Sequence, residues 1–171
     1  MIFGGDVSTG DARTNKTYHY DGTNWTAGGD LNTGRRDLGS AGTQTAGLAF
    51  GGIPGGPNAG TNVTEEYDGS SWTSVNNMNN SKGGMGSGGT QTDAMGAGGG
   101  IGAPGAATNQ TELYDGTNWT AAATLATARH DGGTTSASGS TASIYFGGHP
   151  PFLNNTEEFS SAATTRSVDV S

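Results

Sequence analysis

The sequence predicts an all-β repeat protein, and three observations support this. The decapeptide TYHYDGTNWT at residues 17–26 returns as TEEYDGSSWT at 64–73 and as TELYDGTNWT at 111–120. The spacing is constant, since Trp25, Trp72 and Trp119 lie 47 residues apart both times. Glycine supplies 33 of 171 residues, and no segment shows the i, i+3, i+4 apolar spacing of an amphipathic helix. A fixed period of this length indicates one structural unit stacked several times.

Composition and charge exclude several other classes. Glycine does not recur at every third position, as collagen requires, and regularly placed aromatic residues are atypical of disordered chains. Seven basic against fifteen acidic residues give a net charge of −8, which disfavours nucleic-acid binding. No segment approaches the roughly 20 apolar residues of a membrane-spanning helix, so we predict no membrane insertion. The absence of cysteine excludes disulfides and thiolate metal sites.

Other landmarks keep the same register and divide the chain into four units. The stretch Phe3-Gly4-Gly5 returns at residues 50–52, 97–99 and 146–148, with alanine in place of phenylalanine at Ala97. A basic residue recurs at Arg35, Lys82 and Arg129. We therefore predict a single repeat domain over residues 1–171, with units of roughly 1–33, 34–80, 81–127 and 128–171.

Each unit divides into short strands separated by turn residues. In the second unit the predicted strands are 38–44, 46–50, 63–67 and 71–75. The intervening Gly-rich and Asp-Gly stretches supply the positive φ that tight turns require. Four strands in about 47 residues correspond to one blade of a β-propeller. We expect each Trp to pack between adjacent blades, because one small sheet cannot cover both of its own faces.

The repeat resembles that of kelch-type β-propellers. The kelch pattern of an apolar strand, Gly-Gly, a variable loop, Tyr, a short turn, Trp and a basic residue is matched over essentially the whole chain. In the second unit the matching residues are Leu48, Phe50, Gly51, Gly52, Tyr67, Trp72 and Lys82. The chain departs from the pattern at Ala97 and at Ser160, since no Trp follows Phe159 in the last unit.

The resemblance implies about four blades of four antiparallel strands, or half of a larger propeller. The chain opens on MIFGG, which corresponds to the second strand of a blade, so the first blade is expected to be incomplete. The fourth strand of the last blade is expected from residues 166–171. A four-bladed ring is one outcome, and unpaired end blades that join another copy or a larger assembly are the other. We therefore predict a homo-oligomer or part of a larger assembly.

The loops that vary between units are the predicted place of function. Loops that follow Gly-Gly and linkers that enter the next blade emerge on one face. We expect this face to bind a carbohydrate or protein ligand, with the following candidate residues: Arg35, Arg36, Lys82, Arg129, His130, His149 and Phe152. The alternative for Arg35, Lys82 and Arg129 is a structural role, in which they bind backbone carbonyls near the central channel.

No cofactor is predicted from the sequence. His19, His130 and His149 occupy non-equivalent repeat positions without ligand spacing, which argues against zinc or copper. Asp, Asn and Gly in the loops suit calcium, but no stretch alternates Asp as a dedicated calcium loop does, and Asx-turns explain the same residues. Calcium is kept as the alternative.

The predicted function is a non-enzymatic binding or structural module, such as a component of an adhesin or fibre. A surface rich in Thr, Ser, Asn and Gly suits an extracellular or virion location. The alternative is a glycan-active enzyme of the glycosidase or lyase type. The repeated Glu65-Glu66, Glu112 and Glu157-Glu158 belong to the repeat, whereas such an enzyme needs a single acid/base pair.

Overall fold

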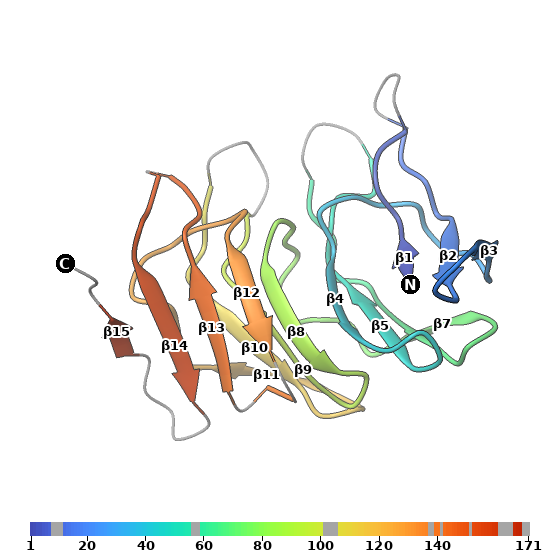
Figure 1. The fold of residues 1–171 in the computed structure, drawn as a ribbon. Coiled ribbons are helices and arrows are strands. Elements are labelled where there is room, and N and C mark those ends of the chain that lie inside the picture. The colour runs from blue at the N-terminus through green and yellow to red at the C-terminus, as the bar shows by residue number, and fades with distance from the viewer. Residues whose placement is uncertain are drawn as a thin grey trace.

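The computed structural model describes residues 1–7, 12–55, 59–100, 106–136, 139–140, 142–150, 152–160 and 166–168. These residues form fifteen strands and no helix, which confirms the all-β prediction. The strands build four separate antiparallel sheets that stand in a row (Figure 1). Since no helix is present in the described part of the chain, none is long and apolar enough to cross a membrane.

Each sheet uses consecutive strands, so the order along the chain is also the order across the sheet. The first sheet contains β1 (Ile2–Phe3), β2 (Thr17–Tyr20) and β3 (Trp25–Ala27). The second contains β4 (Gly39–Gly42), β5 (Gly47–Phe50), β6 (Thr64–Tyr67) and β7 (Trp72–Val75). The third contains β8 (Gly86–Thr90), β9 (Asp93–Ala97), β10 (Thr111–Tyr114) and β11 (Trp119–Ala122). The fourth contains β12 (Gly133–Ser136), β13 (Ala142–Phe146), β14 (Thr156–Ser160) and β15 (Arg166–Val168).

These strands match the predicted blades closely. The first sheet has three strands, as expected for a first blade without its innermost strand. In the last sheet β15 pairs with β14, which confirms that residues 166–168 supply the fourth strand. Residues 169–171 of that prediction lie outside the described residues. The architecture is therefore propeller-like, with one incomplete and three complete blades.

The Gly-Gly pair ends the second strand of each blade, and in the first three blades its first glycine lies close to the linker into the next blade. In the second blade Gly51 and Gly52 have φ values of 61° and 95°, which residues other than glycine rarely adopt. A Cβ atom at Gly51 would lie 2.6 Å from the carbonyl oxygen of Lys82 in the next linker. Both glycines are therefore required by the backbone conformation, and Gly51 also by the close approach of the next linker.

Tryptophan packs between adjacent blades, as predicted. The Trp72 indole N–H donates to Thr17 Oγ1 of the preceding blade at 2.9 Å, and Trp119 does the same to Thr64 at 3.0 Å. Phe50 meets the Trp119 ring at a centroid distance of 4.8 Å. The side chains of Trp72 and Trp119 are buried, so each blade contributes an aromatic residue to the core shared with the blade before it.

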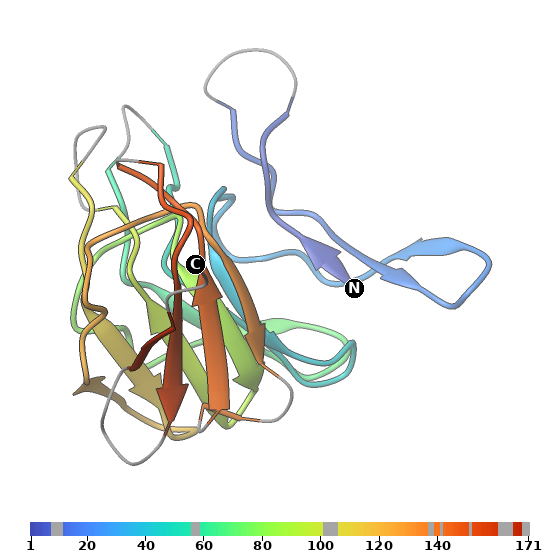
Figure 2. The same ribbon diagram turned by 60° about the vertical axis from the view of Figure 1, so that its left-hand side comes forward.

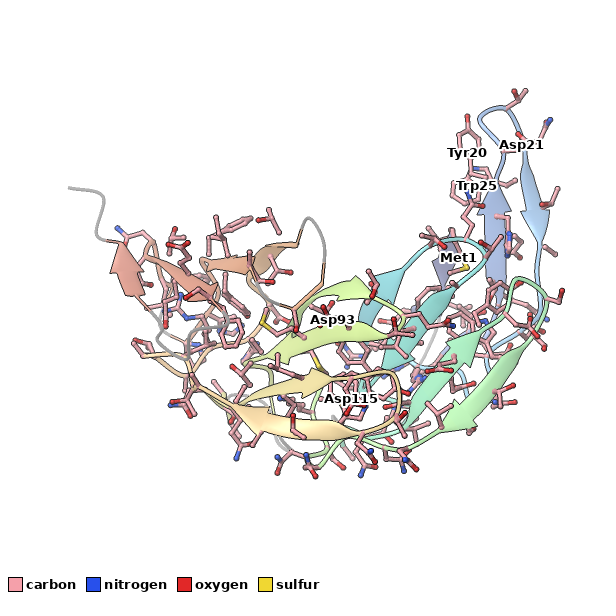
Figure 3. The ribbon with its side chains drawn as sticks, turned by 90° about the horizontal axis from the view of Figure 1, so that it is seen from below. Met1, Tyr20, Asp21, Trp25, Asp93 and Asp115 are labelled. Atoms are coloured by element: carbon pink, nitrogen blue, oxygen red, sulfur yellow. The ribbon has the colours of Figure 1, made fainter. Side chains whose placement is uncertain are left out.

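The row of blades is open in the structure. Among the described residues, the inner strand β4 packs on β8 and β8 packs on β12, while no contact of similar extent joins the first and last sheets. Figures 1 and 2 place these two sheets at opposite ends, with the first projecting away from the other three. Trp25 has no blade in front of it and is 52% exposed. Figure 3 shows Tyr20 and Trp25 together on this outer hairpin. Each end of the row therefore has an uncovered face.

Candidate functional site

The three recurring basic residues lie in the interior. Arg35, Lys82 and Arg129 have no exposed side-chain surface, and each pairs with a buried glutamate of its own blade. The pairs and their N···O distances are Arg35–Glu65 at 2.9 Å, Lys82–Glu112 at 3.6 Å and Arg129–Glu157 at 2.6 Å. A ligand on the surface cannot contact them in this structure, contrary to their expected place on the binding face.

These residues bind backbone carbonyls, as the alternative reading expected. Arg35 Nη1 donates to the carbonyl oxygens of Gly51 at 3.0 Å and Val63 at 2.7 Å. Lys82 donates in the same way to Gly96 and Gln110. Burial lowers the pKa of both Arg35 and Lys82, and the partner glutamates oppose this. The repeated carboxylates therefore neutralise structural cations, as expected for groups that recur in each complete blade.

The residue that follows each recurring basic residue forms an isolated β-bridge at the loop end of its blade. The bridged pairs are Arg36–Ile53, Gly83–Gly100 and His130–His149, and a similar bridge joins Asp6 to Arg13 in the first blade. The next residue in each linker has a positive φ, at Asp37, Gly84 and Asp131. Gly84 N–H donates to the carbonyl of Asp37, and Asp131 N–H donates to that of Gly84, both at 2.8 Å. These bonds bring the loop ends of three blades together.

Ionisable side chains gather at these bridges. We call the group the loop-face cluster, and it consists of Asp6, Arg13, Arg36, Asp37, His130, Asp131 and His149. Arg36 Nη1 lies 2.9 Å from Asp37 Oδ2, and Arg13 Nη1 lies 3.0 Å from Asp6 Oδ1. Unlike the buried ion pairs, the carboxylates of Asp6, Asp37 and Asp131 are 39–56% exposed. The loop-face cluster is therefore accessible to a ligand.

Asp37 has an altered acidity within this cluster. Burial raises its pKa above the ordinary value, Arg36 lowers it, and the nearby carboxylates of Asp131 and Asp6 raise it again. The structure therefore places several carboxyl groups in one electrostatic neighbourhood, from three blades that are distant in sequence.

An exposed aromatic residue adjoins the cluster. Phe152 is 95% exposed, and its ring centroid lies 5.7 Å from that of His149. Parts of the variable loops that the sequence assigns to this face, at 8–11, 56–58, 101–105 and 151, lie outside the described residues. Of the predicted site residues, Arg36, His130, His149 and Phe152 thus lie at the loop face, whereas the recurring basic residues do not.

A wide polar groove follows the inner strands. It has a volume of about 450 Å³, and its lining residues are Met1, Phe3, Ser40, Ala41, Gly42, Thr43, Gln44, Ser87, Gly88, Gly89 and Thr134. Side-chain hydroxyls join the inner strands across the blades, since Ser40 N–H donates to Ser87 Oγ and Ser87 N–H donates to Thr134 Oγ1. Both hydrogen bonds join residues that lie 47 positions apart, so equivalent positions of adjacent blades are bonded to each other.

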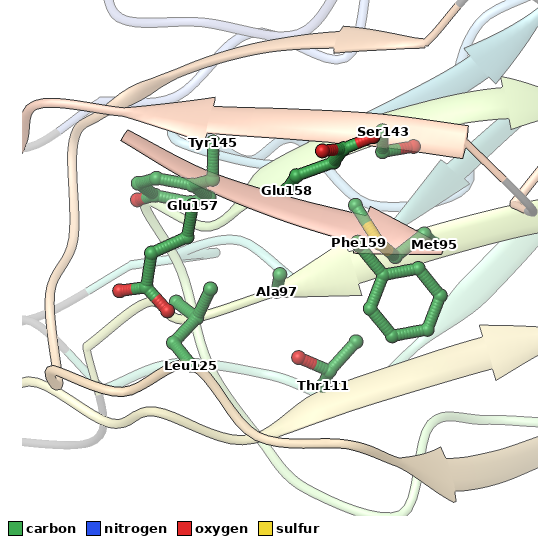
Figure 4. Close-up of a pocket in the computed structure, with 9 residues that line it drawn as sticks. All are labelled: Met95, Ala97, Thr111, Leu125, Ser143, Tyr145, Glu157, Glu158 and Phe159. Carbon is green, nitrogen blue, oxygen red and sulfur yellow. The ribbon is translucent and has the colours of Figure 1, made fainter. Parts of the chain in front are cut away.

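A small apolar pocket marks where the recurring tryptophan is absent from the last blade (Figure 4). Its lining includes Ala97, Thr111 and Phe159. At the junction between the second and third blades the equivalent positions are held by Phe50, Thr64 and Tyr114. Thr111 Oγ1 is buried without a hydrogen-bond partner in the structure, whereas Thr17 and Thr64 each accept from an indole. The pocket is thus a consequence of degeneration of the repeat, and it has space for about one water molecule.

Two histidines that appear unrelated in the sequence are neighbours in space. His130 and His149 exchange backbone hydrogen bonds of 2.9 and 3.1 Å, and their ring centroids are 4.1 Å apart. The linear spacing of the histidines does not show this proximity, which the β-bridge between His130 and His149 creates. Alignment of the units on Gly-Gly could have found the pair, since His149 follows Gly148 directly.

The calcium alternative receives no support from the Asp-Gly turns. The Oδ1 atoms of Asp21, Asp68 and Asp115 each accept two backbone N–H bonds from residues two and three positions ahead. These are the expected Asx-turns, and they occupy the carboxylates locally.

Comparisons with known proteins support the fold and no particular activity. No protein-family model matches the chain, and no curated protein matches it. Among solved structures the chain is similar to one described as "Structure of YjhT", with a TM-score of 0.75 and 12% identity. The match covers 92% of this chain and 53% of that one, so this chain spans about half its length. At this identity the similarity concerns the fold alone, and it places the chain among all-β proteins of propeller-like architecture.

Proposed function

We propose that this chain is a non-enzymatic binding module that recognises a carbohydrate through the loop-face cluster. The observation that carries the proposal is that the cluster departs from the repeat. The positions of Arg36 and Asp37 are occupied by Gly83 and Gly84 in the third blade, which folds in the same way without the charges. The scaffold therefore does not require these side chains, unlike the buried ion pairs that recur in each complete blade.

The chemistry of the cluster suits sugar hydroxyl groups. Guanidinium groups donate and carboxylates accept, so Arg36 and Asp37 together offer both halves of a hydrogen-bonded pair to a hydroxyl. The exposed Phe152 ring near His149 provides an apolar surface for the C–H face of a sugar. A protein ligand is the other partner that this surface suits, and it is an outcome of the test below.

A glycan array tests the proposal. The chain is expected to bind defined glycans, and Arg36→Ala and Phe152→Ala are each expected to weaken binding at least tenfold. Asp21→Asn and Asp115→Asn serve as matched controls, because they change carboxylates in turns outside the cluster and asparagine can keep an Asx-turn. Absence of glycan binding, or equal losses in the control variants, would contradict the carbohydrate assignment. Pull-down of a protein through the same residues would favour the protein ligand instead.

A glycan-active enzyme is the second candidate, favoured by the raised pKa of Asp37 near Asp131. Glycosidases of this type use a pair of carboxyl groups, one as general acid with a raised pKa and the other as base or nucleophile. A panel of chromogenic glycosides separates the two functions. Binding without turnover supports the binding module, whereas turnover that Asp37→Asn abolishes supports the enzyme.

The repeat is proposed to be of kelch type, and the module to act on an extracellular or virion surface as part of an adhesin or fibre. The kelch assignment is supported by the Gly-Gly pair, the inter-blade Trp and the buried basic residue, which recur in the same order. The location is supported by the composition, which is rich in Thr, Ser, Asn and Gly.

The module is further proposed to associate head to tail with a second copy of itself. The first end face consists of Ile2, Tyr18, Tyr20 and Trp25, all 40–56% exposed. The last end face consists of Ile144, Phe146, Thr156 and Glu158, of which Ile144 and Phe146 are 41% and 44% exposed. These two sets correspond, position by position, to the two halves of the interface between the second and third blades.

Three contacts of that internal interface have their counterparts on the end faces. Internally, Trp119 packs on Phe50 and donates to Thr64, and Tyr114 Oη donates to Glu66 at 2.8 Å. On the end faces the corresponding groups are Trp25 and Tyr20 at one end, and Phe146, Thr156 and Glu158 at the other. The Tyr20 and Trp25 rings already lie 5.0 Å apart at 34°, close to the 5.1 Å and 34° of Tyr114 and Trp119. This complementarity favours another blade of the same repeat, in a second copy or in a larger assembly, over an unrelated partner, and the second copy is the version tested.

A further inference from the structure

The bridge at the loop end of the last blade brings three potential metal ligands together. His130 Nδ1 lies 2.9 Å from Asp131 Oδ2, and His149 Nε2 lies 3.7 Å from the same oxygen. One ligand atom from each residue can be chosen so that all three lie within 4.8 Å of one another. Across the described residues, no other group of three His, Asp or Glu side chains comes as close.

The ligand set is specific to this blade. The positions of His130, Asp131 and His149 carry Arg36, Asp37 and Ile53 in the second blade, and three glycines in the third. The same backbone bridge forms in all three blades, so it needs neither histidine. The hydrogen bond between His130 and Asp131 accounts for a polar residue at position 130, because Arg36 bonds to Asp37 in the same way in the second blade. This hydrogen bond does not account for a second imidazole at His149, where the other two blades have Ile53 and Gly100.

We propose that His130, Asp131 and His149 form a binding site for a divalent transition-metal ion of the zinc class. Zinc bonds to nitrogen and oxygen of about 2.0–2.2 Å place tetrahedral ligand atoms roughly 3.3–3.5 Å apart. The observed separations of 2.9 and 3.7 Å from Asp131 lie on either side of this value, and all three atoms lie within 4.8 Å of one another, so side-chain rotations can bring them to it. Two imidazoles and one carboxylate are a ligand set that zinc and its neighbours accept, whereas calcium prefers oxygen ligands alone.

The surroundings hold the ligands and leave the ion accessible. The reciprocal backbone bonds of the bridge hold the two histidines on adjacent segments before metal binds. Asp131 and His149 are 56% and 40% exposed, so a water molecule or a ligand oxygen can complete the coordination. Three protein ligands with an open position are typical of zinc sites that bind or activate a small molecule. This site goes beyond the proposed function and does not require a carbohydrate ligand.

The test is metal binding by the chain without an affinity tag, after treatment with a chelator. Calorimetry with Zn²⁺ is expected to show about one ion per chain, and Co²⁺ is expected to give the visible absorption of a site with nitrogen ligands. His130→Ala and His149→Ala are each expected to weaken Zn²⁺ binding at least tenfold. His149 is partly exposed, so its variant should keep the melting temperature of the metal-free chain, which establishes that it folds.

His19→Ala is the matched control. His19 lies in the first blade, where its Nε2 is 2.9 Å from Tyr67 Oη, so its loss should leave zinc affinity unchanged. The proposal is overturned if the wild-type chain binds no zinc, if His149→Ala binds as the wild type does, or if His19→Ala loses as much affinity as His149→Ala.

Discussion

At the scale of single residues, one motif has different consequences at different positions. Trp25, Trp72 and Trp119 share the same local sequence, and each pairs with a Tyr on the neighbouring strand at 4.9–5.1 Å. Trp72 and Trp119 are buried against the preceding blade, whereas Trp25 is half-exposed. The contribution of each Trp to the free energy of unfolding therefore depends on whether a blade covers it, and not on the motif alone.

This difference gives a matched test of inter-blade packing. Trp72→Ala should lower the free energy of unfolding by about 3–5 kcal/mol, because truncation of a buried Trp leaves a cavity and removes the hydrogen bond to Thr17. Trp25→Ala should cost much less under conditions where the chain is monomeric. Chemical denaturation of both variants measures the difference. Equal losses would mean that the tryptophans do not act through contacts between blades.

At the scale of the element, the outer hairpins depend on an aspartate that binds backbone N–H groups. In β2–β3, β6–β7 and β10–β11 the carboxylate accepts two such bonds, and a glycine with φ of 90–100° follows it. Hydrogen bonds from the N–H groups of Asn24, Ser71 and Asn118, and of the residues before them, lower the pKa of Asp21, Asp68 and Asp115. The charged form thus favours the folded hairpin.

The lowered pKa values predict how stability depends on pH. A carboxyl group whose pKa is lower in the folded chain stabilises it above the unfolded value of 3.8 and loses this effect as pH falls through the folded value. The melting temperature of Asp115→Asn should therefore lie below that of the wild type at pH 6, and the gap should narrow below pH about 3.8. Thermal melts across this range measure it. A gap that stays constant down to the lowest pH would contradict the role of the charge.

At the scale of the whole molecule, repetition leaves complementary surfaces at the two ends of the row. The second and third blades each join a Trp and a Tyr to the second and third strands of the blade before them. Trp25 and Tyr20 at one end, and Phe146 with Thr156 at the other, reproduce the two sides of such a junction. Exposed apolar faces of this kind favour association.

Association is tested by light scattering of the purified chain. We expect a head-to-tail oligomer in the wild type, and a lower mass for Trp25→Ser and for Phe146→Ser. A mixture of the two variants should recover one junction, because each retains the face that the other has lost. A wild-type chain that stays monomeric contradicts self-association. Loss of assembly in Trp25→Ser alone, with none in Phe146→Ser, would indicate pairing of two first end faces instead.

The sequence by itself determined the architecture. The 47-residue period, the Asp-Gly turns and the Gly-Gly pairs predicted the four blades, their strands and the packing of Trp72 and Trp119. These features follow from local chemistry, because the turn residues dictate backbone φ and the period dictates which positions face the next blade.

The tertiary structure decided which side chains a ligand can reach. The recurrence of Arg35, Lys82 and Arg129 left both a surface and a buried role open, and only the buried glutamates beside them settle it. His130 and His149 are 19 positions apart and occupy unlike places in the repeat, yet a β-bridge makes them neighbours. Burial and ligand geometry depend on contacts between segments that are distant in the chain, and linear spacing does not encode those contacts.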